Sequence, residues 1–212
     1  TKRVIINTEW GAFGENGEID ELITPIDQEI DASSVNPGRQ IFEKMISGMF
    51  LGEAARLIII HAAERGFILN GGIPPGLYRP GSFETSMISL SYNTKRFRWL
   101  FLSTFEYNLD KYEYFIISMI CDVVSRRSAD LLAAGLVAIL TQISCPENII
   151  AADGSVFKKH PHYLNYVLTK MDKLISDKIK FEIIFVDGGS GKGAALAACT
   201  ASKKLTKYIP YK

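Results

Sequence analysis

The strongest apolar pattern in the chain lies between Arg39 and Arg65, just before Gly66. Its first apolar residues recur every three or four positions: Phe42, Met45, Ile46, Met49 and Phe50. This spacing places side chains on one face of a helix, and glycine commonly follows a helix end. The pattern predicts a single long helix from Arg39 to Arg65. Gly48 and Gly52 lie one turn apart on it, so we expect another element to pack closely there.

Helical spacing also appears in four later segments. They span Tyr112 to Arg127, Ala129 to Ile143, Tyr163 to Ile175 and Gly191 to Leu205. The second is apolar nearly all round, which predicts a helix buried among other elements. The Gly- and Pro-rich stretch NGGIPPGLYRPGSFETS predicts a loop, in which Phe83 to Ser86 lead into the next helix. We interpret Leu100 to Asp110, whose pattern is ambiguous, as connecting structure.

Short β-branched and apolar runs predict the strands. Val4 to Ile6 form one such run, which ends at the polar Asn7, and Phe181 to Val186 form another. Two further β-like runs flank Asp153 and Gly154, a dipeptide that suits a tight turn, and predict a β-hairpin. Helices mixed with strand-turn-helix units, without an internal repeat, place the chain in the α/β class.

Composition narrows the classes of partner. The chain has 212 residues, of which 47% are hydrophobic and 22% charged, enough to bury a sizeable core. Its 24 basic and 23 acidic residues give a net charge of +1 without a long block of either sign. Neither nucleic acid nor an anionic membrane is therefore an expected partner. The apolar runs Ala54 to Ala63 and Leu131 to Leu140 are interrupted or shorter than the ~20 residues of a membrane span.

The cysteines and histidines give no disulfide or zinc pattern. Cys121, Cys145 and Cys199 are far apart and odd in number, and they lie mostly in apolar helical segments, so we expect reduced, buried thiols in a cytoplasmic protein. Three histidines show no zinc-ligand spacing. The first residues, TKRVIIN, contain neither an initiator methionine nor a signal-peptide core, and we expect the chain to be cut from a longer polypeptide.

The sharpest chemical motif is FEIIFVDGGSGKGAALAAC, a predicted strand followed by a glycine-rich turn and a helix. Backbone N–H groups and the positive end of a helix dipole favour an anion or nucleotide at such a turn. As a P-loop the motif fails, because Lys192 has Val186 six residues before it and Gly193 after it, where Gly and Ser or Thr are needed. A dinucleotide fingerprint fits poorly, because only 18 residues follow Ala194.

Two interpretations of the glycine-rich turn therefore stay open. The turn could lie against the sugar and α-phosphate of a nucleotide, closed by Ser190 or Lys192. It could equally be a tight connection between a strand and a helix. The residues alone support the nucleotide site and the tight connection equally.

A second candidate site consists of Asn7, Glu43 and Glu84, at a predicted strand end, near a helix start and at a loop-helix junction. One amide and two carboxylates on different elements can hydrogen-bond several hydroxyls of one sugar. Their spacing does not show that they converge. By spacing alone, glutamates that face solvent are the simpler interpretation.

Five segments resemble consecutive signatures of eukaryotic hexokinases. They are INTEWGAFG at Ile6 to Gly14, NPGRQIFEKMISGMFLGEAARL at Asn36 to Leu57, GSFETS at Gly81 to Ser86, DGSVFKKHP at Asp153 to Pro161 and GSGKGAA at Gly189 to Ala195. They occur in the family's order and together span nearly the whole chain. The resemblance implies an actin-like, ribonuclease H-related ATPase fold, with residues 1–212 as the large, C-terminal domain of a hexokinase.

The resemblance also implies an activity and its site. A hexokinase transfers the terminal phosphoryl group of ATP, with Mg²⁺ bound through ATP, to the 6-hydroxyl of glucose, mannose or fructose, as the first step of glycolysis. Asn7, Glu43 and Glu84 would hold sugar hydroxyls. Gly189, Ser190 and Lys192 would form the adenosine side of the nucleotide site. The resemblance further suggests a cytoplasmic protein and allows a homodimer, and we interpret Gly154 and Ser155 as hairpin residues rather than ligands.

Parts of the family pattern are missing from this sequence. The phosphate-binding hairpins and the small domain with its sugar-binding Thr-Lys pair and catalytic Asp have no counterpart, so the catalytic base is expected outside this chain. Turn and cap chemistry explains the candidate replacements, Asp20, Asp27, Asp153 and Asp187. The chain alone is expected to be inactive. A noncatalytic, sugar-sensing module is an alternative, and so is a purely architectural role for these residues.

Overall fold

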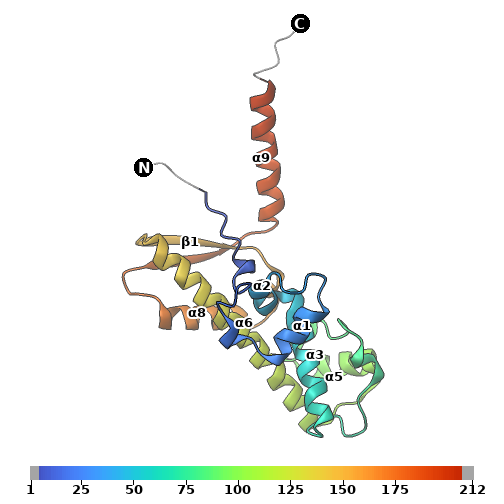
Figure 1. Cartoon of the computed structure of the whole chain (residues 1–212). Helices are drawn as coiled ribbons and strands as arrows, with labels where there is room; N and C mark the ends of the chain where they lie inside the picture. The colour runs from blue at the N-terminus through green and yellow to red at the C-terminus, as the bar shows by residue number, and fades with distance from the viewer. Residues whose placement is uncertain (1–4, 207–212) are drawn as a thin grey trace.

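The computed structural model describes residues 5–206. Its α-helices are α1 (Pro25–Ser33), α2 (Ile41–Ile46), α3 (Gly48–Glu64), α4 (Thr85–Leu90), α5 (Thr94–Phe105), α6 (Lys111–Ile143), α7 (Ser155–Lys159), α8 (Tyr163–Leu174) and α9 (Gly189–Thr206). The strands are β1 (Glu147–Ala152) and β2 (Lys180–Phe185), and the 3₁₀ turns are η1 (Trp10–Ala12), η2 (Asp20–Leu22) and η3 (Pro75–Tyr78). Mixed helix and parallel sheet confirm the α/β class (Figure 1).

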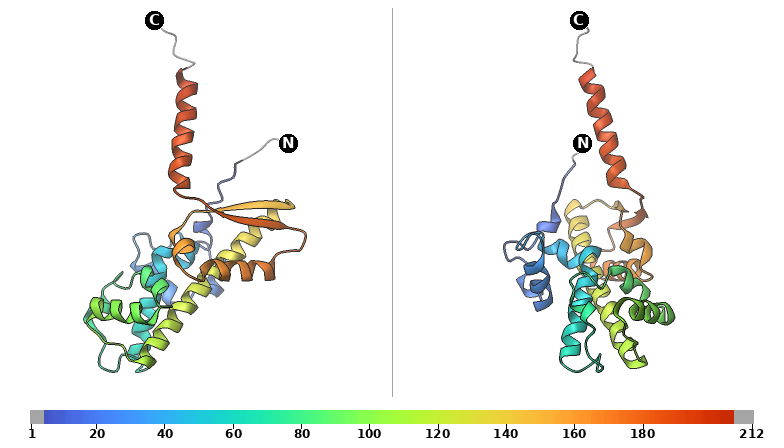
Figure 2. Two further views of the ribbon diagram at one scale, coloured as in Figure 1. Left: turned by 180° about the vertical axis from the view of Figure 1, so that it is seen from behind. Right: turned by 90° about the vertical axis from the view of Figure 1, so that its right-hand side faces the viewer.

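Helix α6 is the axis of the fold and crosses the body of the molecule (Figure 1). It packs against α3, α4 and α8, and together these helices enclose one main apolar core. Completely buried residues of this core include Ile59, Phe97, Phe101, Ile117 and Val167. Helix α9 is arranged differently, because it projects away from the body in every view (Figure 2), and its side chains from Ser190 to Ser202 are exposed.

Strands β1 and β2 pair in parallel, in a register that runs from Glu147 opposite Lys180 to Ala152 opposite Phe185. Helices α7 and α8 form the connection between them. The predicted hairpin at Asp153 and Gly154 is therefore wrong: parallel strands need a crossover, which a two-residue turn cannot supply. Gly154 is extended, with φ −177°, and the residues after it begin α7.

The predicted helix from Arg39 to Arg65 is in fact two helices. Helix α2 ends before Ser47, and the Ser47 hydroxyl accepts a hydrogen bond from the amide of Met49 and caps α3. The expected close packing at the glycines is confirmed. A Cβ on Gly52 would lie 2.2 Å from the carbonyl oxygen of Phe83, and one on Gly48 would lie 2.3 Å from Cγ2 of Val156.

Three other expectations need correction. Residues 112–143 belong to one continuous helix, α6, rather than two. Leu100 to Phe105 are helical, as the end of α5. Ile5 and Ile6 do not form a strand: Ile5 is 100% exposed and Ile6 77%, and neither pairs with a strand of the described chain, while Val4 lies outside the described residues. A strand needs a neighbour for its backbone groups, and Ile5 and Ile6 have none among residues 5–206.

Most other predictions from local patterns are confirmed. Gly66 follows α3 with a φ of +76°, the loop before Thr85 leads into α4, and α8 and β2 lie where predicted. Helix α9 begins two residues earlier than expected, at Gly189.

The cysteines are free, as expected, but only Cys121 is buried, so the expectation of burial is wrong for Cys145 and Cys199. Within residues 5–206, no helix has the length and apolar character needed to cross a membrane.

Candidate functional site

An open pocket of about 460 Å³ lies between the first residues of the described chain and helix α2. Its polar side chains come from Asn7, Thr8, Glu9, Gln40, Glu43 and Ser47. The structure thus brings together two of the three residues that the sequence assigns to a sugar, Asn7 and Glu43. Two carboxylates and two amides around one space provide donors and acceptors for several hydroxyl groups.

Gly11 makes room for this arrangement. A Cβ on Gly11 would lie 2.3 Å from Oε1 of Gln40 and 3.4 Å from Oε2 of Glu43. Glycine at this position lets both side chains approach the backbone of η1. Without that space, Gln40 and Glu43 would have to turn away from Gly11, so the glycine of WGAFG shapes this wall of the pocket.

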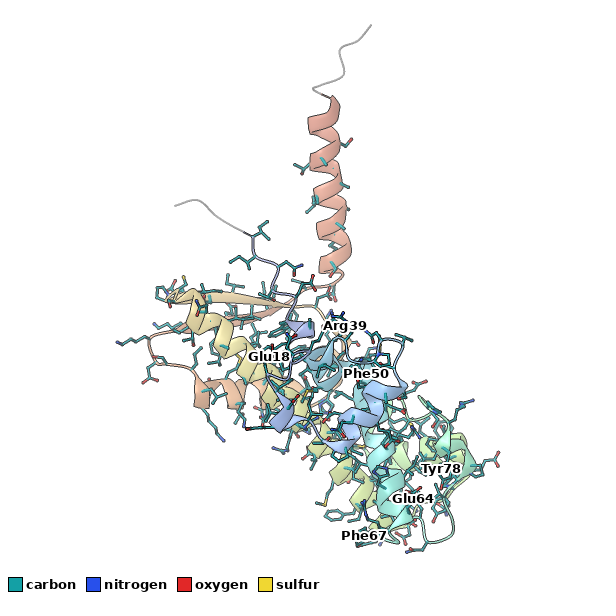
Figure 3. The ribbon with its side chains drawn as sticks, viewed as in Figure 1. Glu18, Arg39, Phe50, Glu64, Phe67 and Tyr78 are labelled. Carbon is teal, nitrogen blue, oxygen red and sulfur yellow. The ribbon has the colours of Figure 1, made fainter. Side chains whose placement is uncertain are left out.

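The carboxylate of Glu15 holds the backbone at Gln40. Gln40 has φ +53°, and its amide donates to Oε1 of Glu15 at 2.8 Å. Arg39, labelled in Figure 3 beside α2, donates to the second carboxylate oxygen of Glu15 at 2.7 Å. The hydrogen bond from Gln40, followed by that from Arg39, lowers the pKa of Glu15 below its usual value. Glu15 is therefore an ionised anchor for the left-handed residue that precedes α2.

Asn7 and Glu9 form a local unit. The Asn7 amide nitrogen donates to Oε1 of Glu9 at 2.5 Å, and the Glu9 backbone N–H donates back to Oδ1 of Asn7 at 3.3 Å. Glu9 also has a positive φ of 44°. Sequence reasoning missed Glu9 and Gln40, although each lies two or three residues from a predicted ligand within the same motif. Their polarity and their place in INTEW and GRQIFEK were the available signals.

The structure does not place Glu84 in this pocket. Its carboxylate accepts a hydrogen bond from the Ser86 hydroxyl at 3.0 Å, and its backbone packs against Gly52 of α3. The neighbouring Thr85 hydroxyl donates to the carbonyl of Gly48 and accepts from the amide of Gly52 at 3.0 Å. Glu84 is thus fixed beside the start of α3, and its role as a sugar ligand stays a prediction.

A second pocket, of about 330 Å³, lies between α3, α4 and α7. Its polar lining comes from Thr85, Ser86, Ser89, Ser155 and Lys159. Four hydroxyls and one ammonium suit an anion or a polyhydroxyl group. The two pockets share consecutive residues of the chain: Ser47 lines the first pocket, and Gly48 lines the second.

The glycine-rich turn forms the start of α9. The amide of Gly189 donates to Oδ2 of Asp153 at 2.8 Å, which ties the turn to the segment leading to Ser155 of the second pocket. Ser190 and Lys192 are exposed and line neither pocket. Their role, like that of Gly189, as nucleotide ligands stays a prediction.

Three of the four aspartates considered as replacement bases have partners for their side chains. Asp27 belongs to the capping box of α1 and accepts two hydrogen bonds from Arg127, each 2.8 Å long. Asp153 binds the start of α9, Asp187 pairs with a lysine, and Asp20 begins η2. Among residues 5–206, no group of three His, Cys, Asp or Glu side chains could hold a metal ion.

Comparisons with known proteins find hexokinases. A family model described as hexokinase matches residues 1–200. Hexokinase-2 of Rattus norvegicus is 39% identical over 97% of this chain and 23% of its own length, and the hexokinase of Schistosoma mansoni is 35% identical over 95% of this chain and 46% of its own. The chain thus spans about a quarter of the mammalian relative and under half of the Schistosoma one.

Solved structures show the same likeness. The hexokinase from Schistosoma mansoni complexed with glucose superposes with a TM-score of 0.78 and 34% identity, over 84% of this chain and 42% of that one. A second hexokinase crystal structure has a TM-score of 0.74 and 27% identity, over 87% of this chain and 41% of that one. The expected fold, part of an actin-like hexokinase domain, is therefore confirmed.

Proposed function

The chain belongs to the hexokinase family, and we propose that it is the large domain of an enzyme that transfers the terminal phosphoryl group of ATP to a hexose hydroxyl. The observation that carries this proposal is the open pocket where Asn7, Glu9, Gln40 and Glu43 converge. Carboxylates accept hydrogen bonds from sugar hydroxyls, and the amides both donate and accept. A ligand that lacked those hydroxyls would leave this polar wall without partners and would bind less well.

Glucose is the hexose that we favour. Its presence in the similar Schistosoma mansoni structure supports this choice. The polar wall can orient several hydroxyls at once, so the hydroxyl that reacts would be the one left facing the nucleotide. Mannose and fructose differ from glucose in the hydroxyls offered to that wall, and titration with each sugar would rank them.

For the nucleotide we propose the second pocket, extended by the turn at Gly189. Lys159 supplies a positive charge for phosphate, and Ser86, Ser89 and Ser155 supply hydroxyls for ribose or phosphate oxygens. The bond from Gly189 to Asp153 keeps the start of α9 near this pocket. Mg²⁺ would arrive on the phosphates of ATP, since the described residues offer no cluster of metal ligands.

In this proposal, the residues of the chain bind and orient the hexose and the nucleotide. They hold the two substrates in neighbouring pockets, which brings a hydroxyl and a phosphoryl group together. Removal of the proton from the attacking hydroxyl needs a base, and Asp27, Asp153 and Asp187 are already bound to Arg127, the Gly189 amide and Lys158. We therefore propose that the base lies in a part of the enzyme outside residues 1–212, and that this chain alone binds ligands without turning them over.

The test is an NMR titration of ¹⁵N-labelled chain with glucose and, separately, with Mg-ADP. We expect glucose to shift the amide signals around Glu43, and Mg-ADP those around Ser155. Glu43→Gln should weaken only glucose binding, and Lys159→Met only Mg-ADP binding, so each variant is the control for the other. Shifts spread evenly over the surface, or none with either ligand, would contradict the proposal.

A further inference from the structure

The break between α2 and α3 leaves the Ile46 carbonyl without its helical partner. In a continuous helix, the amide of Phe50 would bond the carbonyl of Ile46. Here that amide donates to the carbonyl of Ser47, at 3.0 Å, because α3 starts anew after Ser47. The Ile46 carbonyl is thus available to a donor from another element, and a carbonyl at the edge of an apolar core needs one.

Ser128, in the middle of α6, supplies that donor. Its hydroxyl donates to the carbonyl of Ile46 at 2.9 Å, and its oxygen lies 2.7 Å from the hydroxyl of Tyr163 on α8. A serine hydroxyl has one proton, which goes to Ile46, so Tyr163 must donate to Ser128. Burial raises the pKa of Tyr163 to about 12, which keeps its proton in place.

The two hydroxyls of this chain of hydrogen bonds are buried, and its Ile46 end is partly buried. Ser128 is 1% exposed and Tyr163 2%. Water cannot replace a partner that is lost inside such a core, so a missing hydroxyl leaves an unsatisfied group. The chain from Tyr163 through Ser128 to Ile46 therefore holds α8, α6 and the end of α2 in one fixed arrangement.

The anchored carbonyl lies at the boundary of the two pockets. Ile46 and Ser47 line the polar pocket that holds Glu43, and Gly48 lines the pocket between α3, α4 and α7. The ring of Tyr163 also packs edge-on against Phe157 of α7, with 5.3 Å between ring centres. One buried tyrosine thus contacts α7, the helix that supplies part of the lining of one pocket, and, through Ser128, the junction shared by both.

We infer that Ser128 and Tyr163 are positioning residues that keep the α2–α3 junction in register, so that both pockets have their binding geometry at the same time. This inference rests on the proposed function. Neither residue touches a substrate in it. Their contribution is to the placement of Glu43 on one side of the junction and of Gly48 on the other.

The experiment compares two buried serines of α6 in the 212-residue chain. Ser128→Ala removes the bond to Ile46. Ser125→Ala is the matched control, because Ser125 is also fully buried but bonds the carbonyl of Cys121 and the ring of His160 instead. Both variants lose a buried hydroxyl and should lose similar thermal stability, which circular dichroism would measure.

The decisive measurement is the Kd for glucose and for Mg-ADP, from amide NMR titrations. Ser128→Ala should raise both values by about fivefold, the change expected from one buried hydrogen bond, whereas Ser125→Ala should leave both unchanged. Ser128→Thr restores a hydroxyl and should restore both Kd values. Tyr163→Phe leaves the bond to Ile46 intact and should have a smaller effect than Ser128→Ala.

These measurements distinguish a failure of the proposed function from a failure of this inference alone. If the unmodified chain binds neither ligand, the proposed function and this inference are both wrong. If it binds both and Ser128→Ala binds them equally well, only the inference is overturned. An equal loss of affinity in the Ser125→Ala control would also overturn it, because the effect would then be a general loosening of α6.

Discussion

The carboxylate of Asp153 accepts a hydrogen bond of 2.8 Å from the backbone N–H of Gly189, and so joins the residue after β1 to the first residue of α9. An ion pair between Lys158 and Asp187 adds to this connection. The rest of α9 has exposed side chains as far as Ser202 and extends away from the body (Figure 2). These polar contacts join the start of α9 to the body.

Replacing Asp153 should loosen α9. Asp153→Ala removes the acceptor for the Gly189 amide, and loss of a helix cap costs about 1 kcal/mol. We expect peptides from residues 189–206 to exchange their amide hydrogens about fivefold faster, as measured by mass spectrometry. Asp153→Asn keeps an oxygen acceptor and should have a smaller effect. Unchanged exchange in Asp153→Ala would show that other contacts hold the helix.

Gly52 should tolerate no side chain. In Gly52→Ala the new Cβ would lie 2.2 Å from the carbonyl oxygen of Phe83 and 2.7 Å from the amide nitrogen of Thr85, both backbone atoms that cannot rotate away. We expect the free energy of unfolding to fall by about 3 kcal/mol, as measured by urea denaturation.

The matched control is Gly191→Ala. Gly191 is also helical, but a Cβ added there would have no heavy atom of another element within 4 Å, and alanine favours a helix more than glycine does. This control should keep or slightly raise stability. Equal stability of Gly52→Ala and Gly191→Ala would mean that α3 and the segment at Phe83 do not pack as closely as described.

Local signals predicted most of the fold, and tertiary contacts decided the rest. Gly66 marked the end of a helix correctly, because a residue with positive φ there is a local requirement. The break at Ser47 was missed, since the Ile46 carbonyl at the break bonds Ser128, which lies far away in the sequence. Asp153 and Gly154 suggested a hairpin because the sequence does not show that the partner strand begins only at Lys180.

The candidate site was predictable to a similar degree. Asn7 and Glu43 were identified by the motifs around them, and they do line one pocket. Glu9 and Gln40 were missed because both have positive φ, and rules of helical or strand spacing do not say where side chains on such a backbone point. Glu84 was grouped with Asn7 and Glu43 because of its motif, and the structure places its carboxylate against the Ser86 hydroxyl instead.

His160 should stay neutral in mildly acidic solution. Its Nδ1 accepts the amide of His162 at 3.2 Å, so its Nε2 carries the proton and donates to Ser125 at 3.0 Å. The rings of Tyr92 and Tyr163 pack against it. Burial, followed by repulsion from His162, lowers the pKa of His160 to about 4. NMR titration of its ring protons should give this value, and a midpoint near the ordinary ~6.5 would contradict it.

The same shift predicts how stability changes with pH. Because the folded-state pKa is depressed, the contribution of His160 to stability is fully present above pH ~6.5, where the histidine of the unfolded chain is also neutral. It is lost as the pH falls from there through about 4, because the unfolded chain binds the proton first. The melting temperature of His160→Gln should therefore fall less over this range than that of the unmodified chain.

The ion pair between the buried Lys44 and the partly buried Asp31 should make the stability of the α1–α2 corner depend on pH in acid. Lys44 is 6% exposed, and its ammonium donates to Oδ1 of Asp31 at 2.6 Å and to the carbonyl of Asn36 at 2.8 Å. Burial alone would raise the pKa of Asp31, but the bonds from Lys44 and the Gly38 amide outweigh it and hold the pKa below its usual value.

A carboxyl with a depressed folded-state pKa stabilises the protein above its unfolded pKa of ~4, and that contribution disappears as the pH falls through the folded-state value. Unfolding free energies of the unmodified chain should therefore decrease below pH ~4. In Asp31→Asn this decrease should be smaller, and in Lys44→Met stability should already be lower at pH ~7, because Asp31 keeps only the Gly38 amide.

Since the two side chains interact, the variant that combines Lys44→Met with Asp31→Asn should lose less stability than the sum of the losses from the single changes. Additive losses would show that the two side chains do not interact in solution.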